Sequence, residues 1–174
     1  MRTNYQREEK EFEEKVVQVR RVTKVVTGGK RMGFRVLTVV GDRKGRVGIG
    51  IGKAAEVSTA IRKGVEAAKK AMITAPLIGS TIPHEITGRL GASNVLLRPA
   101  ASGRGVIAGG AVRVVLELAG IKDIVAKIIG SSSAINCAKA TVLALTNLKR
   151  QDKEEELRGQ ALNIVSAQAG EAGA

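Results

Sequence analysis

Three branched aliphatic residues alternate with three glycines in the run Val47-Gly48-Ile49-Gly50-Ile51-Gly52. Side chains of a strand point alternately to its two faces, so this period of two predicts a β-strand with one aliphatic face and one bare face. A bare face lets a helix, a neighbouring strand or a nucleic acid approach the strand backbone closely. The pattern by itself leaves open which of these three packs on the strand.

The segments around this strand predict a module of three strands and one helix. Residues 16–26 and 34–40 are rich in apolar and β-branched residues, which favours strands. Glycines bound a hairpin loop at 41–45, and the glycine-rich basic segment 27–33 predicts another turn. From Ala54 to Thr74 apolar residues recur at steps of three and four, so a helix should follow, and Pro76 marks its end.

The second half of the chain predicts an α/β module, and the fold class is α+β. A glycine- and alanine-rich loop occupies 99–110, and serines at 131–133 offer N-caps for the last helix. We predict strands at 94–98 (with 82–86 as its candidate partner) and 123–129, and helices at 111–118 and 134–149. The expected divisions are a charged flexible N-terminus at 1–14, modules at 15–75 and 76–150, and a disordered tail at 151–174.

The charge of the chain indicates a polyanionic partner. Its 174 residues carry a formal net charge of +13, which repels itself unless nucleic acid or, second, an anionic membrane neutralises it. No apolar run is long enough to span a membrane, and the basic helix has a small-residue face that suits a sheet better than lipid. Aromatic residues make up 2% of the chain, which disfavours base stacking on aromatic rings.

Basic residues gather in the first half, where acidic residues are scarce. Between Val16 and Lys53 the only acidic residue is Asp42, so a merely solvated charged face fits poorly. Turns project, glycines let amides reach phosphate oxygens, and arginine makes forked contacts, so we predict recognition of the backbone and shape of folded RNA. The predicted RNA-binding residues are Arg20, Arg21, Lys24, Gly28, Gly29, Lys30, Arg31, Arg35, Arg43, Lys44, Arg46 and Lys53.

The sequence offers few of the residues that a catalytic or metal site needs. The one histidine, His84, is expected to be structural or solvated, and the one cysteine, Cys137, is expected to be buried and inert. One Cys and one His supply no zinc cluster, and a single cysteine favours a reducing compartment. We therefore predict no enzyme, no metal and no cofactor.

Two glycine patterns resemble nucleotide-binding motifs but fall short of them. Residues 48–53 end in Gly-Lys, yet a phosphate-binding loop would need Gly at Val47 and Ser or Thr at Ala54. Residues 103–108 fit G-x-G-x-x-A, and Asp123 lies near the spacing of a ribose-binding acid. However, residues 99–102 separate this pattern from the preceding strand, so a loop packed against another macromolecule is the preferred interpretation.

Several segments carry a resemblance to a known family. They are RVTKVVTGGKR at 21–31, TVVGD at 38–42, GRVGIG at 45–50, RPA at 98–100, GVIAGGAVRVVLE at 105–117 and NCAKAT at 136–141. Over roughly residues 12–150 the chain resembles bacterial small-subunit ribosomal protein number five. The resemblance implies an N-terminal module like a double-stranded-RNA-binding domain and a C-terminal α/β module with a left-handed βαβ crossover, whereas the usual hand is right.

The resemblance also implies a place in the ribosome. It implies binding to 16S rRNA where head, body and central pseudoknot meet, contacts with small-subunit ribosomal proteins four and eight, and a role near the mRNA entry path and in decoding accuracy. Residues 27–33 would reach rRNA near the spectinomycin site. Gly105 and Arg113 would lie toward protein four, and Arg104 stands where the family often has a small neutral residue. The expected location is a cytoplasmic ribosome or a plastid ribosome.

Two other classes of function stay open from the sequence. A free regulatory or processing factor that binds double-stranded RNA would also be basic and carry such a module. A small nucleotide-dependent enzyme is the third class, and absence of a heat-stability shift with ATP or NAD would dispose of it.

Overall fold

The first module is a four-stranded antiparallel sheet with one helix on one of its faces. The computed structural model describes residues 12–159, so the predictions for residues 1–11 and for the tail at 160–174 lie outside the described residues. The sheet order is β1-β2-β3-β4. The elements are β1 (Glu13–Val26), β2 (Gly29–Gly41), β3 (Arg46–Ala54), α1 (Val57–Lys70) and β4 (Ile73–Thr74).

The bare glycine face of β3 is covered by α1. A Cβ atom on Gly50 would overlap the carbonyl oxygen of Gly64, and one on Gly52 would overlap that of Ala60. Because backbone atoms of α1 occupy the space, only glycine permits this approach. Of the three occupants that the sequence allowed, the structure has the helix.

The β1–β2 hairpin is longer and its turn is shorter than predicted. β1 begins at Glu13, and Lys30, Arg31 and Met32 pair with β1 instead of lying in a seven-residue turn. The turn itself is Thr27 and Gly28, and the positive φ of 95° at Gly28 explains why two residues suffice. The helix prediction was also too long, because residues 73 and 74 form β4 instead.

The second module has a four-stranded sheet of order β5-β6-β8-β7. β7 and β8 are parallel neighbours joined through α2, which gives the expected βαβ unit; its left hand stays a prediction. The elements are β5 (Ile86–Leu90), β6 (Ser93–Pro99), β7 (Val106–Ile107), α2 (Gly110–Leu118), β8 (Ile124–Gly130), α3 (Ala134–Thr146) and α4 (Gln151–Arg158).

Three details of this module differ from expectation. The partner of β6 is β5, which begins at Ile86, four residues after the start of the predicted segment 82–86, while Ile82 is a core residue outside any strand. β7 lies inside the predicted loop and pairs with β8. Helix α4 occupies the start of the tail predicted to be disordered, and Glu154 there pairs with Lys149 and Arg158.

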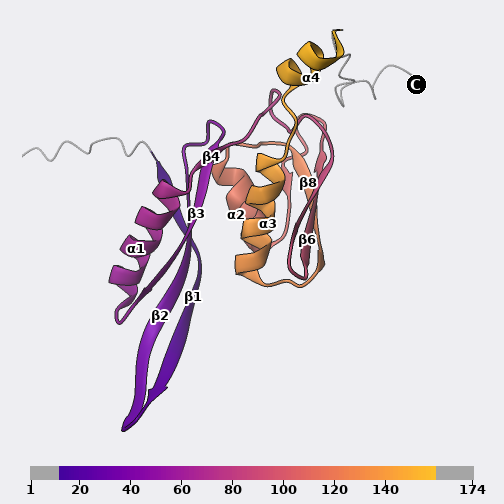
Figure 1. Ribbon diagram of the computed structural model, residues 1–174. Coiled ribbons are helices and arrows are strands. Elements are labelled where there is room, and N and C mark those ends of the chain that lie inside the picture. Colours follow the sequence, from indigo (N-terminus) through magenta and orange to yellow (C-terminus); the bar gives the residue numbers. More distant parts are fainter. Residues whose placement is uncertain (1–11, 160–174) are drawn as a thin grey trace, which may run out of the picture.

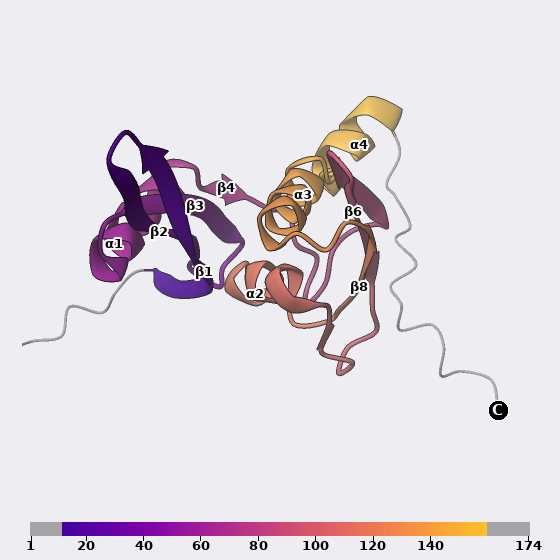
Figure 2. The ribbon, with the colours of Figure 1, turned by 90° about the horizontal axis from the view of Figure 1, so that it is seen from below.

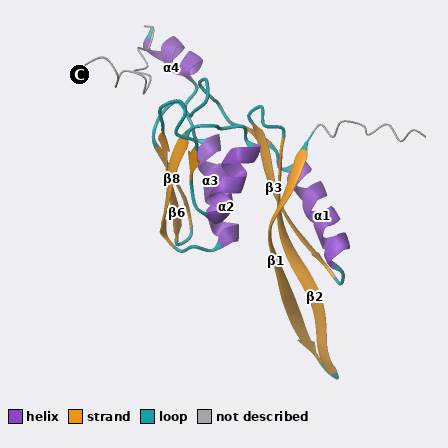
Figure 3. Cartoon of the chain, turned by 180° about the vertical axis from the view of Figure 1, so that it is seen from behind, coloured by secondary structure: helices purple, strands orange, loops and turns teal. Residues whose placement is uncertain are grey.

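The two modules stack as alternating layers. Figure 3 shows the β6 and β8 sheet, then α2 and α3, then the β1–β3 sheet, then α1, and Figure 2 shows the same order from another side. One hydrophobic core joins the modules. Leu37, Val39 and Val47 belong to the first module, and they pack in the same cluster as Val115 and Leu145 of the second module. The modules are therefore held together by side-chain packing as well as by the chain.

Candidate nucleic-acid interface

The β1–β2 hairpin projects beyond the helices that cover the rest of the sheet (Figure 1). β2 spans Gly29–Gly41, which at 3.3 Å per residue is about 40 Å of strand. Near the tip, Val25 is 73% exposed and Met32 is 61% exposed. A two-stranded hairpin is marginally stable by itself, so the uncovered part of this hairpin near its tip points to a surface that another molecule covers.

Five cations lie on one face of this hairpin and the adjacent end of β3. Arg20 of β1 is opposite Arg35 of β2, which in turn is opposite Lys53 of β3. Four residues nearer the tip, Lys24 is opposite Arg31. Directly opposed residues in a sheet share a face, so these five side chains (Arg20, Lys24, Arg31, Arg35 and Lys53) form what we call the cationic face.

The cationic face has no counter-charge among residues 12–159. Like charges directly across a strand pair are destabilising. Within residues 12–159, no acidic side chain pairs with any member of this face, although Lys15 and Lys69 on the same module do have carboxylate partners. A fold that keeps opposed cations without counter-charges is suited to an external polyanion.

The cationic face lies next to the part of the sheet that packs on the second module. Leu37 and Ile51 lie two residues from Arg35 and Lys53, on the same face of the sheet. Leu37 is 2% exposed and Ile51 is partly buried in the shared core. A ligand on the cationic face would therefore lie beside the α2 and α3 layer.

Other predicted residues of the hairpin lie elsewhere on it. Arg21 is opposite Phe34 and Lys30 is opposite Val25, which places both cations on the face that α1 covers farther along the sheet. Gly28 and Gly29 form the tip, where an added Cβ would meet nothing within 4 Å. The open tip leaves the backbone amides approachable from outside.

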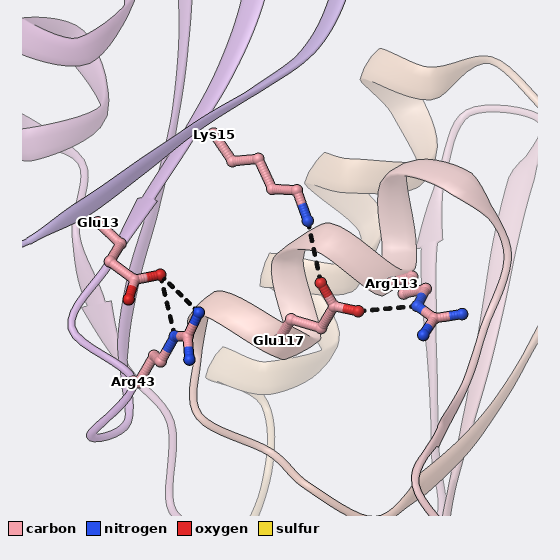
Figure 4. A network of polar contacts seen from close by, with 5 residues as sticks. All are labelled: Glu13, Lys15, Arg43, Arg113 and Glu117. Atoms are coloured by element: carbon pink, nitrogen blue, oxygen red, sulfur yellow. Dashed lines mark hydrogen bonds and ion pairs between the residues drawn. The ribbon is translucent and has the colours of Figure 1, made fainter.

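Three predicted residues are at the opposite end of the hairpin. The loop after β2 carries Arg43 and Lys44, and Arg46 begins β3, so all three lie about 40 Å from the tip by the length of β2. Arg43 pairs with Glu13 at 2.8 Å (Figure 4). Its backbone amide donates to the Leu118 carbonyl of the second module at 3.0 Å. This loop thus joins the two modules and is not continuous with the cationic face.

Asp42 organises that loop. Its carboxylate accepts hydrogen bonds from the Lys44 amide at 2.7 Å and the Arg46 amide at 3.0 Å, and it pairs with the Arg46 guanidinium at 2.6 Å. Burial raises the pKa of Asp42, but these hydrogen bonds together outweigh it, and the pKa is lower than usual. The guanidinium of Arg46 also lies 5.1 Å from the centroid of the Phe12 ring, so part of its role is structural.

Arg113, predicted to face a protein partner, is part of an ion-pair network. Its Nε donates to Glu117 at 2.7 Å, and the other oxygen of Glu117 accepts from Lys15 of the first module at 3.1 Å (Figure 4). The hydrogen bonds from Arg113 and then Lys15 lower the pKa of Glu117. Glu117 therefore connects the predicted partner surface to β1, which sequence spacing could not reveal.

Gly105, the other predicted partner contact, is fixed by Asp123. The Gly105 amide donates to the Asp123 carboxylate at 2.9 Å, and that side chain is 4% exposed. A hydrogen bond from Ser80, followed by those from the amides of the 103–105 loop, lowers the pKa of Asp123. Because its carboxylate is used inside the chain, Asp123 is not free to bind a ribose, and the dinucleotide interpretation fails.

His84 and Cys137 have structural surroundings. The Lys149 amide donates to Nε2 of His84 at 3.0 Å, and Nδ1 lies 2.9 Å from the Glu85 carbonyl oxygen, so the neutral ring carries its proton on Nδ1. Cys137 is 1% exposed on α3. Within residues 12–159, no three His, Cys, Asp or Glu side chains come together as a possible metal site.

The fold and this surface define a two-module protein with a projecting strand pair whose cations suit a polyanionic ligand. Residues 12–76 match the family model described as "Ribosomal protein S5, N-terminal domain", and residues 88–158 match "Ribosomal protein S5, C-terminal domain". The "Small ribosomal subunit protein uS5c" of Emiliania huxleyi is 60% identical over 140 residues, which are 80% of this chain and 88% of that protein.

The chain belongs to the ribosomal protein S5 family. This confirms the family resemblance, the two-module α+β fold and the non-enzymatic, rRNA-binding class of the protein. Between residues 12 and 159, none of the helices has the length and apolar character needed to cross a membrane.

Proposed function

We propose that the chain is a structural constituent of the small ribosomal subunit that binds 16S rRNA at the junction of head, body and central pseudoknot. The single observation that supports this most is the cationic face, with opposed cations and no acidic partner among the described residues. In this proposal Arg20, Arg35 and Lys53 contact phosphates as one row, and Lys24 and Arg31 as a second.

Phosphate contacts at this face release counterions. Each neutralised phosphate contributes about −0.7 to −0.9 to the slope of log affinity against log salt concentration, so five contacts give a slope of about −4. The arginines add forked contacts that fix the register of the hairpin on the RNA. Because backbone oxygens carry no sequence information, specificity would come from the shape of the folded RNA.

Protein contacts and position complete the proposal. The family resemblance supports contacts with small-subunit ribosomal proteins four and eight, with Gly105 and Arg113 toward protein four. It also supports a place along the mRNA entry path and an influence on decoding accuracy. We propose that the chain acts in a bacterial-type ribosome, cytoplasmic or plastid.

Sucrose-gradient sedimentation with matched variants tests this function. The native chain should cosediment with small subunits, whereas Lys30→Glu with Arg31→Glu should lose most of this association. Arg31 belongs to the cationic face, and both positions lie beside the tip of the hairpin, where new negative charges would repel phosphates. Arg62→Glu with Lys63→Glu, two exposed cations on α1, makes the same charge change away from the hairpin and should cosediment normally. Equal incorporation of both double variants would refute the hairpin assignment.

The sedimentation experiment also separates the alternative function. A free regulatory or processing factor would stay out of the subunit fraction and bind unrelated RNA duplexes with similar affinity. The described structure gives no specific support to that alternative.

A further inference from the structure

The side chain of His84 connects the segment between the two modules to the residues that join α3 and α4. Its Nε2 accepts a hydrogen bond from the Lys149 amide at 3.0 Å, and its Nδ1 donates to the Glu85 carbonyl oxygen, 2.9 Å away. The contact bridges two points that are 65 residues apart in the sequence. Both ring nitrogens are in use, one as a donor and the other as an acceptor.

The direction of α4 depends on the residues just before it. In Figure 1 and Figure 3, α4 lies beyond the ends of both sheets, and its Leu157 is 82% exposed. Leu148 is buried in the shared core, so the chain is anchored there. The Lys149 amide follows and is held by His84, and α4 begins at Gln151. The ring therefore fixes the chain at the point where α4 leaves the second module.

An open groove borders this contact. It has a volume of about 340 Å³ and is lined by residues 74–78, Pro83, Lys149 and Arg150. His84 itself is half-buried. Solvent can therefore exchange a proton with the ring, and the groove leaves room for residues 149 and 150 to move.

Protonation of the ring would remove the acceptor of this hydrogen bond. An imidazolium carries a hydrogen on each nitrogen, so Nε2 would then point an N–H group at the N–H group of Lys149. Among residues 12–159, no carboxylate pairs with the ring, since Glu85 binds Arg98 at 2.7 Å and Glu154 binds Lys149 at 3.0 Å. The charged ring would also face a segment that carries the cations of Lys149 and Arg150. Both effects move residue 149 away from the ring.

We propose that His84 is a pH-dependent latch, which holds the start of α4 while the ring is neutral and releases it when the ring is protonated. Histidine is the side chain that ordinarily changes its charge between about pH 5 and 8. The release is local, because Leu148 stays in the core and the Asn147 amide still donates to the Leu143 carbonyl at 3.1 Å. The inference goes beyond the proposed function, since the latch acts in the free chain without RNA or a partner protein.

Amide hydrogen exchange of the full-length chain, followed by NMR, tests this latch. The protection factor of the Lys149 amide should fall about fivefold from about pH 7.5 to about pH 5.5, which is the factor that corresponds to one ordinary hydrogen bond. The protection factor is the measure to use, because it removes the intrinsic dependence of exchange on pH. The Asn147 amide is the internal control and should keep its protection.

Two variants separate the latch from a merely structural contact. In His84→Gln the side-chain carbonyl can accept the same hydrogen bond at every pH, so protection of the Lys149 amide should stay high. In His84→Ala there is no acceptor, so protection should be low at both pH values. A His84→Gln chain with the pH dependence of the native chain would overturn the latch.

The native chain alone decides the question should a variant fail to fold. The carbon shifts of the imidazole ring and the amide shift of Lys149 should change with the same midpoint as the pH falls. Different midpoints, a ring that stays neutral at about pH 5.5, or unchanged protection of the Lys149 amide at that pH would each overturn the proposal.

Discussion

Replacing Arg35 by glutamine should stabilise the free chain while it weakens RNA binding. Arg35 is the middle member of the row formed with Arg20 and Lys53, so it has a like charge directly opposite on each side. None of the three has an acidic partner within residues 12–159. Glutamine keeps part of the aliphatic stem, which is half-buried, and removes the two repulsions.

The size of the gain follows from Coulomb's law. With charges splayed to about 7 Å in water, each repulsion is about 0.6 kcal/mol before screening. For Debye lengths of about 30, 8 and 3 Å, the two repulsions together fall to about 0.9 kcal/mol at 0.01 M salt, 0.5 at 0.15 M and 0.1 at 1 M. At low salt this corresponds to a rise in Tm of roughly 2–3 °C for a chain of this length.

Urea unfolding of both proteins at the three salt concentrations measures this gain. Arg62→Gln on α1 is the control, because Arg62 has Glu66 four residues away and its removal relieves no opposed cation. In parallel, rRNA affinity of Arg35→Gln should fall by about tenfold, since a charge-assisted contact is lost. A destabilised Arg35→Gln chain at 0.01 M salt, or a gain that does not shrink with salt, would refute the opposed-cation argument.

Three further predictions concern packing, acid stability and loop geometry. Gly50→Ala should destabilise the chain by about 3 kcal/mol or more in urea unfolding, because the added methyl overlaps the backbone of Gly64. Glu117→Gln should make the free energy of unfolding fall less steeply as the pH drops below about 5. The pKa of Glu117 is lower in the folded chain than in the unfolded chain, so its carboxylate contributes stability above the unfolded pKa, and this contribution is lost as the pH falls. Asp123→Asn should raise amide hydrogen exchange at Gly105, because a neutral acceptor holds that amide more weakly.

Local patterns predicted the first module well. The glycine alternation at residues 47–52 required a strand with a bare face, and the helical period after it supplied a surface to cover that face. The length of the hairpin was underestimated because no core lies beside Lys30, Arg31 and Met32, so their sequence shows no alternation of apolar and polar residues. Without a core, the strand pairing itself holds the segment extended, and a single sequence does not show pairing.

The candidate site was only partly predictable for a similar reason. In the sequence, Arg35 and Arg43 belong to one basic stretch. In the structure, the length of β2 separates Arg43 from the tip of the hairpin, and Glu13 neutralises the charge of Arg43. The role of Glu117 depends on β1 lying beside α2, a contact between segments about a hundred residues apart. Residue types indicated the chemistry, whereas long-range packing decided which cations remain free.

The junction between the modules gives the cationic face a fixed position relative to the second module. The loop after β2 is bound to the end of α2 by backbone hydrogen bonds, from Arg43 to Leu118 at 3.0 Å and from Gly45 to Ala119 at 2.9 Å. Backbone bonds hold direction more strictly than flexible ion pairs, and the shared core leaves little room for sliding. RNA bound at the cationic face would therefore keep a fixed place beside the α2 and α3 layer.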